Sequence, residues 1–367
     1  MRSVDALKGS LGRVVQLTRN FTSETSLRSE VVEAISAAFE AGWADPKKIS
    51  QASSRAAALR GAAIDELADF LEVSPAKIEL VGEPAILHHL AIQGYLREGA
   101  HLVTSNLDVG KVRAVAHGYG GPKANLQSDA NGLLSITPEI TDFLNSSQES
   151  GLISLQLRNG EIGTTQDIAG LLEQISNEVR VVLDCTKAIP IPLNPAISAA
   201  TYDATAWQGP AGLGFLVIQN DEKYRYPLPH LAPIRTPGSY SLPLLVGAIV
   251  ALNLYKQDLA KMIKARSVLS SGLSTITGVT LIGADSESDS RYISIIVDGA
   301  IAEECVRKLN NLGIALDAGS ACSPDYLAPS HVITSLGFKA ESHLRITLNT
   351  EHTTEDISGL IEAIKSL

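Results

Sequence analysis

The chain has 367 residues, of which 45% are hydrophobic, and its formal net charge of −10 gives a pI near 5.3. This length exceeds what one hydrophobic core usually fills, so we expect a large domain and a smaller second one. The acidic charge argues against nucleic acid or an anionic membrane as a partner, because neither finds a basic surface here.

The N-terminal residues and the cysteines indicate the cellular compartment of the protein. Residues 1–15 hold no apolar core of signal-peptide length, and the longest apolar stretch, residues 242–252, is too short to span a bilayer. We therefore expect a cytoplasmic protein. Cys185, Cys305 and Cys322 lie far apart without metal-ligand spacing, which predicts neither a disulfide scaffold nor a metal site.

Strand-like runs alternate with helical stretches from about residue 30 to 235, which predicts a mostly parallel sheet covered by helices. Strands are expected at 78–81, 101–104, 114–117, 152–157, 179–183 and 214–218, and helices at 30–41, 53–71 and 165–176. A helix at 243–264 then leads to strands at 280–282, 292–297, 315–317 and 344–348 and helices at 302–312 and 354–366. We predict a large α/β domain at 17–242 and a small α+β domain made of 1–16 and 243–367.

The segment at residues 312–346 carries the clearest chemical signal. Cys322 lies there between Gly, Ser and Ala on one side and Ser and Pro on the other, and a helical pattern resumes only near Pro329. A lone cysteine is usually a small buried hydrophobe. The small polar neighbours favour a mobile and accessible thiol instead.

This segment resembles the active-site loop of the cysteine desulfurases, the NifS-like branch of the class V aminotransferases. In that family a loop reading GSACS carries the thiol that takes sulfur from cysteine as a persulfide, and Cys322 stands at its place. Residues 344–347 are similar to the family's I-R-F-S strand, whose arginine clamps the substrate carboxylate. Arg345 matches that arginine, and a guanidinium suits the bidentate role, although a strand-edge surface charge is the alternative.

The resemblance covers nearly the whole chain. Residues 159–164 stand at the family's N-N-E-T-G-T turn, which makes Asn159 a candidate substrate-binding residue, and 209–214 match G-P-K-G-V-G. Residues 238–243, which include Ser239, match a segment that usually reaches into the neighbouring subunit. The resemblance implies a fold-type I pyridoxal-phosphate transferase fold, with a mostly parallel seven-stranded-type sheet in the large domain, and a homodimer.

Several family contacts to pyridoxal phosphate differ here. The family's Schiff-base lysine lies in S-x-H-K just before G-P-K-G, whereas residues 203–208 lead directly into Gly209, which we interpret as a deletion. The phosphate-binding S-G-G-T-E becomes residues 82–86, where Pro84 offers no N–H and Glu83 would repel a phosphate. Val109 replaces the ring-stacking histidine. Gly160 replaces the asparagine that addresses the ring hydroxyl.

Two residues of the implied cofactor site, Asp184 and Lys187, are polar and keep a possible contact with the cofactor. Asp184 stands where the family pairs a carboxylate with the pyridine nitrogen, although a capping carboxylate is the simpler interpretation. Lys187 stands at a position that faces the cofactor's hydroxyl edge in the family. An alternative is therefore that Lys187 forms the Schiff base in place of the missing lysine. His88 and His89 are more simply explained as structural. We expect no conventional pyridoxal phosphate binding, which leaves Asp184, Lys187 and Ser239 as vestigial cofactor residues.

The sequence thus predicts a degenerate cysteine-desulfurase-like protein that carries or regulates persulfide sulfur through Cys322. It would act as a homodimer and exchange sulfur with a donor or acceptor protein. One alternative is an active pyridoxal-phosphate-dependent desulfurase, or another class V enzyme, that uses Lys187. A second alternative is a structural partner of an active homologue, with Cys322 as a relic.

Overall fold

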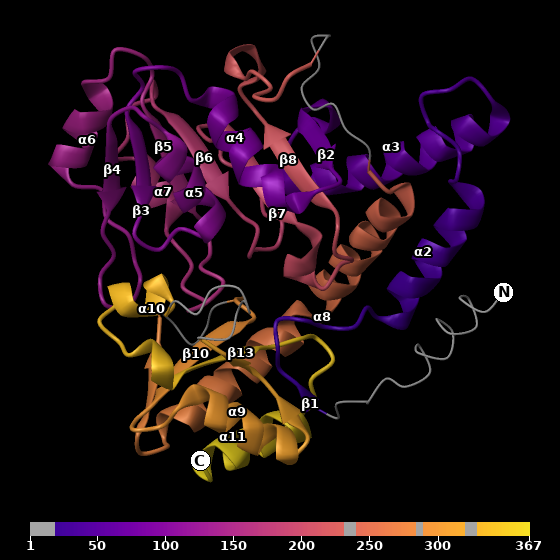
Figure 1. Ribbon diagram of the computed structural model, residues 1–367. Coiled ribbons are helices and arrows are strands. Elements are labelled where there is room, and N and C mark those ends of the chain that lie inside the picture. The colour runs from indigo at the N-terminus through magenta and orange to yellow at the C-terminus, as the bar shows by residue number, and fades with distance from the viewer. Residues whose placement is uncertain (1–18, 231–239, 284–288, 320–328) are drawn as a thin grey trace, which may run out of the picture.

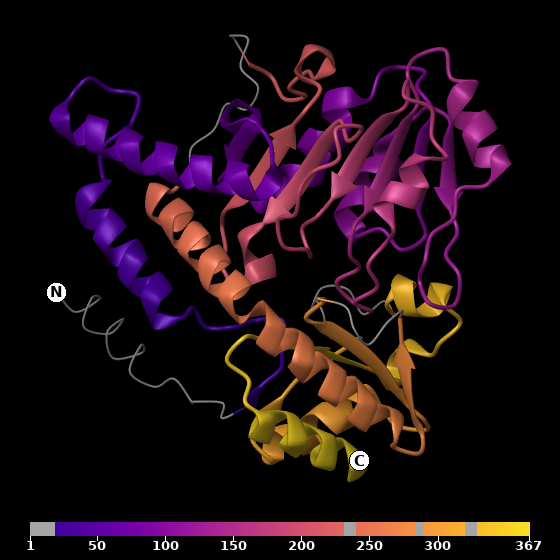
Figure 2. The same cartoon turned by 180° about the vertical axis from the view of Figure 1, so that it is seen from behind.

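The computed structural model describes residues 19–230, 240–283, 289–319 and 329–367. A large part is built on a seven-stranded sheet, and a smaller part on a four-stranded antiparallel sheet (Figure 1). A long helix, α8 (Leu242–Ser274), runs from the first part into the second, as the view from behind shows (Figure 2). The predicted fold class, with a mostly parallel sheet and a smaller second domain, is confirmed.

The large sheet has the strand order β2-β8-β7-β6-β5-β3-β4. Its members are β2 (Ile78–Val81), β3 (Leu102–Ser105), β4 (Lys123–Leu126), β5 (Leu152–Gln156), β6 (Arg180–Asp184), β7 (Ala199–Asp203) and β8 (Gly214–Ile218). Neighbours from β4 to β7 pair in parallel, while β8 is antiparallel to both β7 and β2. The parallel strands therefore end at one edge of the sheet, and the residues that follow them meet there.

The helices of the large part are α2 (Ser29–Ala41), α3 (Gln51–Leu71), α4 (Leu87–Tyr95), α5 (Gly110–Gly118), α6 (Pro138–Asn145) and α7 (Ile168–Leu172). Of these, α2 packs mainly on α8, away from the sheet (Figure 1). Helix α4 packs against β5, β6, β7 and β8, and Leu87, Leu90 and Ala91 are fully or almost fully buried there. The beginning of α4 therefore lies over the carboxyl edge of the central strands.

One predicted strand is wrong. Residues 114–117 belong to helix α5, which buries Val112 and Val115 at a spacing of three residues. The alternating letters A-V-A-H resemble a strand only in a short window, whereas the longer window has helical spacing. Strands β4 and β7 were not predicted, because β4 has polar residues and β7 begins with two alanines, which lack strand propensity.

The small part has the strand order β12-β13-β10-β9, with β9 (Val279–Ile282), β10 (Tyr292–Val297), β12 (Asp317–Ala318) and β13 (His343–Thr347). Its helices are α9 (Ala302–Asn311), α10 (His331–Ser335) and α11 (Thr354–Lys365). A separate pair joins β1 (Arg19–Asn20) to β11 (Ile314–Ala315) in parallel. The strand predicted at 315–317 is thus divided between β11 and β12.

Helix α8 is long and apolar enough to span a membrane by length and composition alone. Half of its most apolar 18-residue window is buried inside the protein, and α8 packs against α2, α3 and α11. Packing between the two parts of the molecule therefore accounts for its apolar composition.

Buried polar contacts fix the small part against the carboxyl edge of the large sheet. Arg291 donates to the carbonyl oxygens of Leu348 (2.9 Å) and Thr205 (3.1 Å). The Gln208 side chain accepts from the Thr350 N–H at 2.9 Å. Thr205 and Gln208 lie in and just after the short 3-10 helix η3 (Ala204–Trp207) that follows β7. These hydrogen bonds hold the two parts of the molecule together at this junction.

Candidate functional site

A cavity of about 220 Å³ lies at this junction. The large part contributes Leu107, Val109, Asn159, Gly160, Glu161, Lys187 and Thr205, and the rest of the chain contributes Ser23, Tyr292, Val332 and Arg345. Three residues selected from the sequence, Asn159, Lys187 and Arg345, thus line one cavity. Cys322 and Ser239 lie outside the residues that the structure describes.

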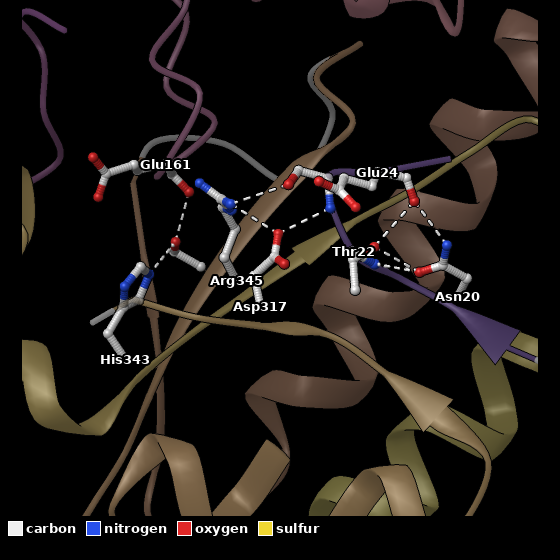
Figure 3. A network of polar contacts seen from close by, with 9 residues as sticks. Asn20, Thr22, Glu24, Glu161, Asp317, His343 and Arg345 are labelled. Atoms are coloured by element: carbon white, nitrogen blue, oxygen red, sulfur yellow. Dashed lines mark hydrogen bonds and ion pairs between the residues drawn. The ribbon is translucent and has the colours of Figure 1, made fainter. Parts of the chain in front are cut away.

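Arg345 is held by an acidic partner on the neighbouring strand. It pairs in register with Asp317, and its Nη2 lies 2.8 Å from Asp317 Oδ2 and 3.3 Å from Ser23 Oγ. The Ser23 N–H also donates to Asp317 Oδ2, at 2.9 Å. Figure 3 shows the guanidinium between this cluster and the segment that carries Glu161. A substrate carboxylate would therefore share Arg345 with Asp317.

Lys187 lies in the loop after β6, and its aliphatic chain covers Gly160. A Cβ atom at position 160 would come within 2.7 Å of Lys187 Cγ and 2.9 Å of Cδ, closer than real Cβ contacts come. A larger residue at 160 would force this side chain to move. The missing Cβ of Gly160 therefore leaves the space that the Lys187 side chain fills.

Asn159 is buried and its side chain holds the turn after β5. Its Oδ1 accepts from the N–H groups of Glu161 (2.9 Å) and Ile162 (3.1 Å), and its Nδ2 donates to Leu107 O (3.1 Å) and Gln156 Oε1 (3.0 Å). These bonds use the ordinary hydrogen-bonding capacity of the amide. Asn159 thus shapes the cavity wall, and its predicted contact with substrate stays a prediction.

A row of polar side chains crosses the carboxyl edge of the large sheet. Gln156, Asp184 and Thr201 are register partners on β5, β6 and β7, so they share one face. Asp184 Oδ1 accepts from the Thr186 N–H (2.8 Å) and hydroxyl (2.7 Å), and its Oδ2 lies 3.0 Å from His88 Nε2 of α4. Burial alone would raise the pKa of Asp184. His88 and Thr186 outweigh burial and hold that pKa well below its usual value, so the carboxylate is ionised.

A second buried carboxyl group lies near Asp184. Burial, with a smaller contribution from the charge of Asp184, raises the pKa of Asp108 to about 7, although the Ser105 N–H donates to it at 2.7 Å. Asp108 Oδ1, His88 Nδ1, Gln156 Nε2 and Thr201 Oγ1 are buried without a hydrogen-bond partner among the described residues. Buried polar atoms rarely lack partners, so this cluster has the capacity to bind a polar group.

The buried side chain of His343 lies near Arg345 and is linked through Ser294 to the segment that carries Glu161. His343 Nε2 lies 2.6 Å from Ser294 Oγ, which donates to the Glu161 carbonyl oxygen at 2.6 Å (Figure 3). Burial, with the charge of Arg345 adding, lowers the pKa of His343 to about 4, so the imidazole is neutral near pH 7. Gly319 packs on this ring, and a Cβ there would overlap His343 Nδ1.

Similarity to known proteins agrees with this arrangement. Residues 234–360 match the family model "Aminotransferase class-V". The chain is 26% identical over 371 residues to cysteine desulfurase IscS of Methanosarcina thermophila, covering 94% of this chain and 90% of that protein. It is 25% identical over 325 residues to IscS of Pectobacterium carotovorum, with coverage of 82% and 79%.

Solved structures have the same fold. A NifS-like protein superposes with a TM-score of 0.82 at 20% identity, over 95% of this chain and 98% of that one. A NifS-like protein from Rickettsia africae gives a TM-score of 0.79 at 18% identity, with the same coverage. In sequence and in fold the chain is similar to the NifS-like branch of the class V aminotransferases. Its fold is accordingly the fold-type I architecture expected from the sequence.

Similarity to the cysteine desulfurases corrects the cofactor prediction. We expected no conventional pyridoxal phosphate, but the relatives are IscS and NifS cysteine desulfurases, which depend on that cofactor. Pyridoxal phosphate is therefore the cofactor that the family implies for this chain. The interpretation of residues 203–208 as a deletion stays a prediction. These residues form the end of β7, the helix η3 and the residue that follows it.

Several residues in and beside this cavity suit the ring of that cofactor. Asp184 offers an ionised carboxylate, Lys187 offers an amine in the cavity wall, and the unpartnered polar atoms around Asp184 suit a polar ring. The residues at the family's phosphate position are arranged differently. Glu83 Oε1 accepts from the Ala85 N–H at 3.0 Å, at the start of the 3-10 helix η2 (Pro84–Ile86), so that N–H is already used.

Sequence reasoning missed two partners in this site. His88 was interpreted as structural, yet it contacts Asp184. Asp317 was not selected at all, although it pairs with Arg345 across adjacent strands. Neither pair has a local sequence signal, because strand register and helix placement bring the partners together.

Proposed function

We propose that this chain transfers sulfur from a cysteine-type amino acid to the thiol of Cys322. The observation that carries this proposal is the single cavity lined by Arg345, Lys187 and Asn159. A guanidinium suits the substrate carboxylate, and an amine nearby suits a carbonyl cofactor. The GSACS-like loop supplies the acceptor thiol in the same part of the chain as Gly319, which packs beside His343 below Arg345.

Pyridoxal phosphate, when bound, supplies an electrophilic carbonyl and an electron-accepting ring, and Lys187 and Asp184 are the amine and the carboxylate that this site offers to it. Arg345 orients the substrate through its carboxylate. The Asn159 turn and η3 form the walls that limit water around the bound amino acid.

The sulfur step balances without an external oxidant. The Cβ–Sγ bond of L-cysteine breaks, and an S–S bond to Cys322 Sγ forms, so the enzyme thiol becomes a persulfide. The amino-acid carbon is reduced and leaves as alanine, with the protons of the two thiols shared between alanine and the persulfide. An acceptor thiol, small or on a protein, then removes the outer sulfur by exchange.

We predict that Lys187 retains the cofactor. After incubation with pyridoxal phosphate and reduction with borohydride, peptide mapping should find the pyridoxyl adduct on Lys187. Lys187→Ala should lower adduct formation at least about tenfold, because no other lysine lines the described cavity. Lys264→Ala, which removes an exposed lysine of α8, is the control and should change nothing. An adduct on another lysine, or no adduct in the unaltered protein, contradicts this role.

A second candidate is a persulfide carrier or regulator without cysteine turnover of its own. The contact between Arg345 and Asp317 favours it, because that pair satisfies part of the guanidinium before any substrate arrives. Alanine release from L-cysteine separates the two candidates. A carrier would accept sulfur from an active desulfurase without releasing alanine, and a purely structural partner would do neither.

We also propose that the chain forms a homodimer through an arm made of α2, the turn after it and the beginning of α3. This arm lies at the end of the molecule opposite α6 and β4 (Figures 1 and 2). It exposes several large apolar side chains, namely Val32, Phe39, Trp43 and Ile49. Large exposed apolar side chains on one part of a molecule are candidates for an association surface. We further propose that the chain works in the cytoplasm and exchanges sulfur with a donor or acceptor protein.

The assembly prediction is tested by charging the arm. Light scattering should give a dimer for the unaltered chain at micromolar concentration and a monomer for Phe39→Asp with Trp43→Asp, because two buried carboxylates would face an apolar interface. The control is Val268→Asp, an exposed apolar position on α8. A monomeric unaltered chain, or a dimer that persists in the double variant, rejects this interface.

A further inference from the structure

His88 lies on the first turn of α4 and reaches across to the end of β6. His88 and Asp184 are 4% and 2% exposed, and His88 Nε2 lies 3.0 Å from Asp184 Oδ2. The two hydrogen bonds that Thr186 donates to Asp184 end on the other oxygen, Oδ1. In the part of the chain that the structure describes, Oδ2 is therefore contacted by the imidazole and is not otherwise bonded.

The contact between His88 and Asp184 is close. His88 Nε2 lies 3.0 Å from Asp184 Oδ2, and both the charge of His88 and its contact with the carboxylate lower the pKa of Asp184. A charged donor that reached the same oxygen would compete with the imidazole for it. A protonated pyridine nitrogen is a donor of that kind.

We propose that His88 occupies the Asp184 oxygen that a pyridinium ring would use, and so sets the affinity of this site for pyridoxal phosphate. This inference rests on the proposed function, because it assumes that the cofactor binds beside Asp184. His88 therefore competes with the cofactor's ring nitrogen for the same oxygen of Asp184. It must turn away from Asp184 before the ring nitrogen can bond there.

The buried surroundings give the displaced imidazole another acceptor. Asp108 is fully buried, senses the charges of both Asp184 and His88, and leaves Oδ1 without a partner among the described residues. His331 Nε2 is bonded to the backbone oxygen of Asp108, at 2.9 Å, and so does not use this carboxyl oxygen. Moving His88 toward Asp108 would therefore exchange one buried carboxyl partner for another and avoid an unpaired imidazole.

The test compares cofactor affinity in His88→Ala and the unaltered full-length chain, from the absorbance of bound pyridoxal phosphate. Removal of the competing imidazole should tighten the dissociation constant about tenfold, the effect of one hydrogen bond to a charged group. The same variants are titrated with 1-deazapyridoxal phosphate, which has carbon in place of the ring nitrogen. This analogue should gain nothing from the substitution.

His89→Ala is the matched control, because His89 is the next residue of α4 and is half-buried. It should leave both dissociation constants unchanged. If His88→Ala does not fold, His88→Leu keeps most of the side-chain volume, removes the imidazole, and should shift the affinity in the same direction.

The outcomes separate this inference from the proposed function. Equal pyridoxal phosphate affinity with and without His88 overturns the inference and leaves the proposed function standing. An equal gain for the deaza analogue also overturns it, since the effect would then come from space and not from the ring nitrogen. Absence of binding in the unaltered chain and in all variants overturns both proposals.

Discussion

Replacement of Arg345 by glutamine is expected to weaken binding of L-cysteine to the pyridoxal-phosphate-loaded protein by about a hundredfold. Arg345 lines the cavity, and a hydrogen bond between charged partners contributes about 1.5–3 kcal/mol. Glutamine retains an amide NH₂ group that donates hydrogen bonds but has no charge. Arg345→Lys should fall between the two, since a lysine keeps the charge without the bidentate fork. Calorimetric titration of the loaded protein with L-cysteine measures all three.

Replacement of Asp317 is expected to change the affinity for L-cysteine in the opposite sense. Its carboxylate lies 2.8 Å from the Arg345 guanidinium and competes with a substrate carboxylate for that charge. Asp317→Asn should therefore tighten L-cysteine binding severalfold while Arg345→Gln weakens it. Arg55→Gln, which removes an exposed charge on α3, controls for net charge and should have no effect. Unchanged affinity in Arg345→Gln rejects the carboxylate-binding role.

The main elements of this fold were predictable because their apolar patterns are long and unambiguous. Strands β2, β8 and β10 have the predicted limits, and α8 has a continuous apolar face that extends ten residues beyond its predicted end. Prediction failed where a window was short, as at α5, or where the strand lacked strand-forming residues, as at β4 and β7. In those places tertiary packing decides the structure.

Three residues that line the candidate cavity were selected from the sequence, but the pairings around them were not. Arg345, Lys187 and Asn159 were selected through the family resemblance, and the structure places them around one cavity. The pairs of Arg345 with Asp317 and of Asp184 with His88 depend on strand register and on the position of α4.

The pair of Lys187 and Gly160 shows why a list of departures from a family motif misleads. Gly160 looks like a lost cofactor contact in the sequence, whereas its missing Cβ is the space that the Lys187 side chain fills. Residues that change together in space have to be interpreted together. The prediction of a lost cofactor rested mainly on the missing S-x-H-K segment and on residues 82–86, and Gly160 was counted with them, whereas the relatives imply a retained cofactor.

Replacement of Cys322 by serine is expected to abolish persulfide uptake completely, whether the sulfur comes from L-cysteine, an active desulfurase or a small persulfide. Serine offers no thiolate and cannot form the S–S bond. The other two cysteines are poor substitutes, because Cys185 is 0% exposed and Cys305 is 3% exposed. Burial raises the pKa of both thiols, so little thiolate exists near pH 7.

The measurement is alkylation at limiting reagent followed by mass spectrometry, with and without prior sulfur loading. Cys322 should label first and carry the whole persulfide signal, while Cys185→Ser and Cys305→Ser should keep it, provided that each variant folds. These two replacements control for the loss of a thiol as such. If Cys185 or Cys305 labels first, or if Cys322→Ser still carries sulfur, the loop is a relic. A structural partner of an active homologue then becomes the better account of this chain, because its cavity would have no sulfur acceptor of its own.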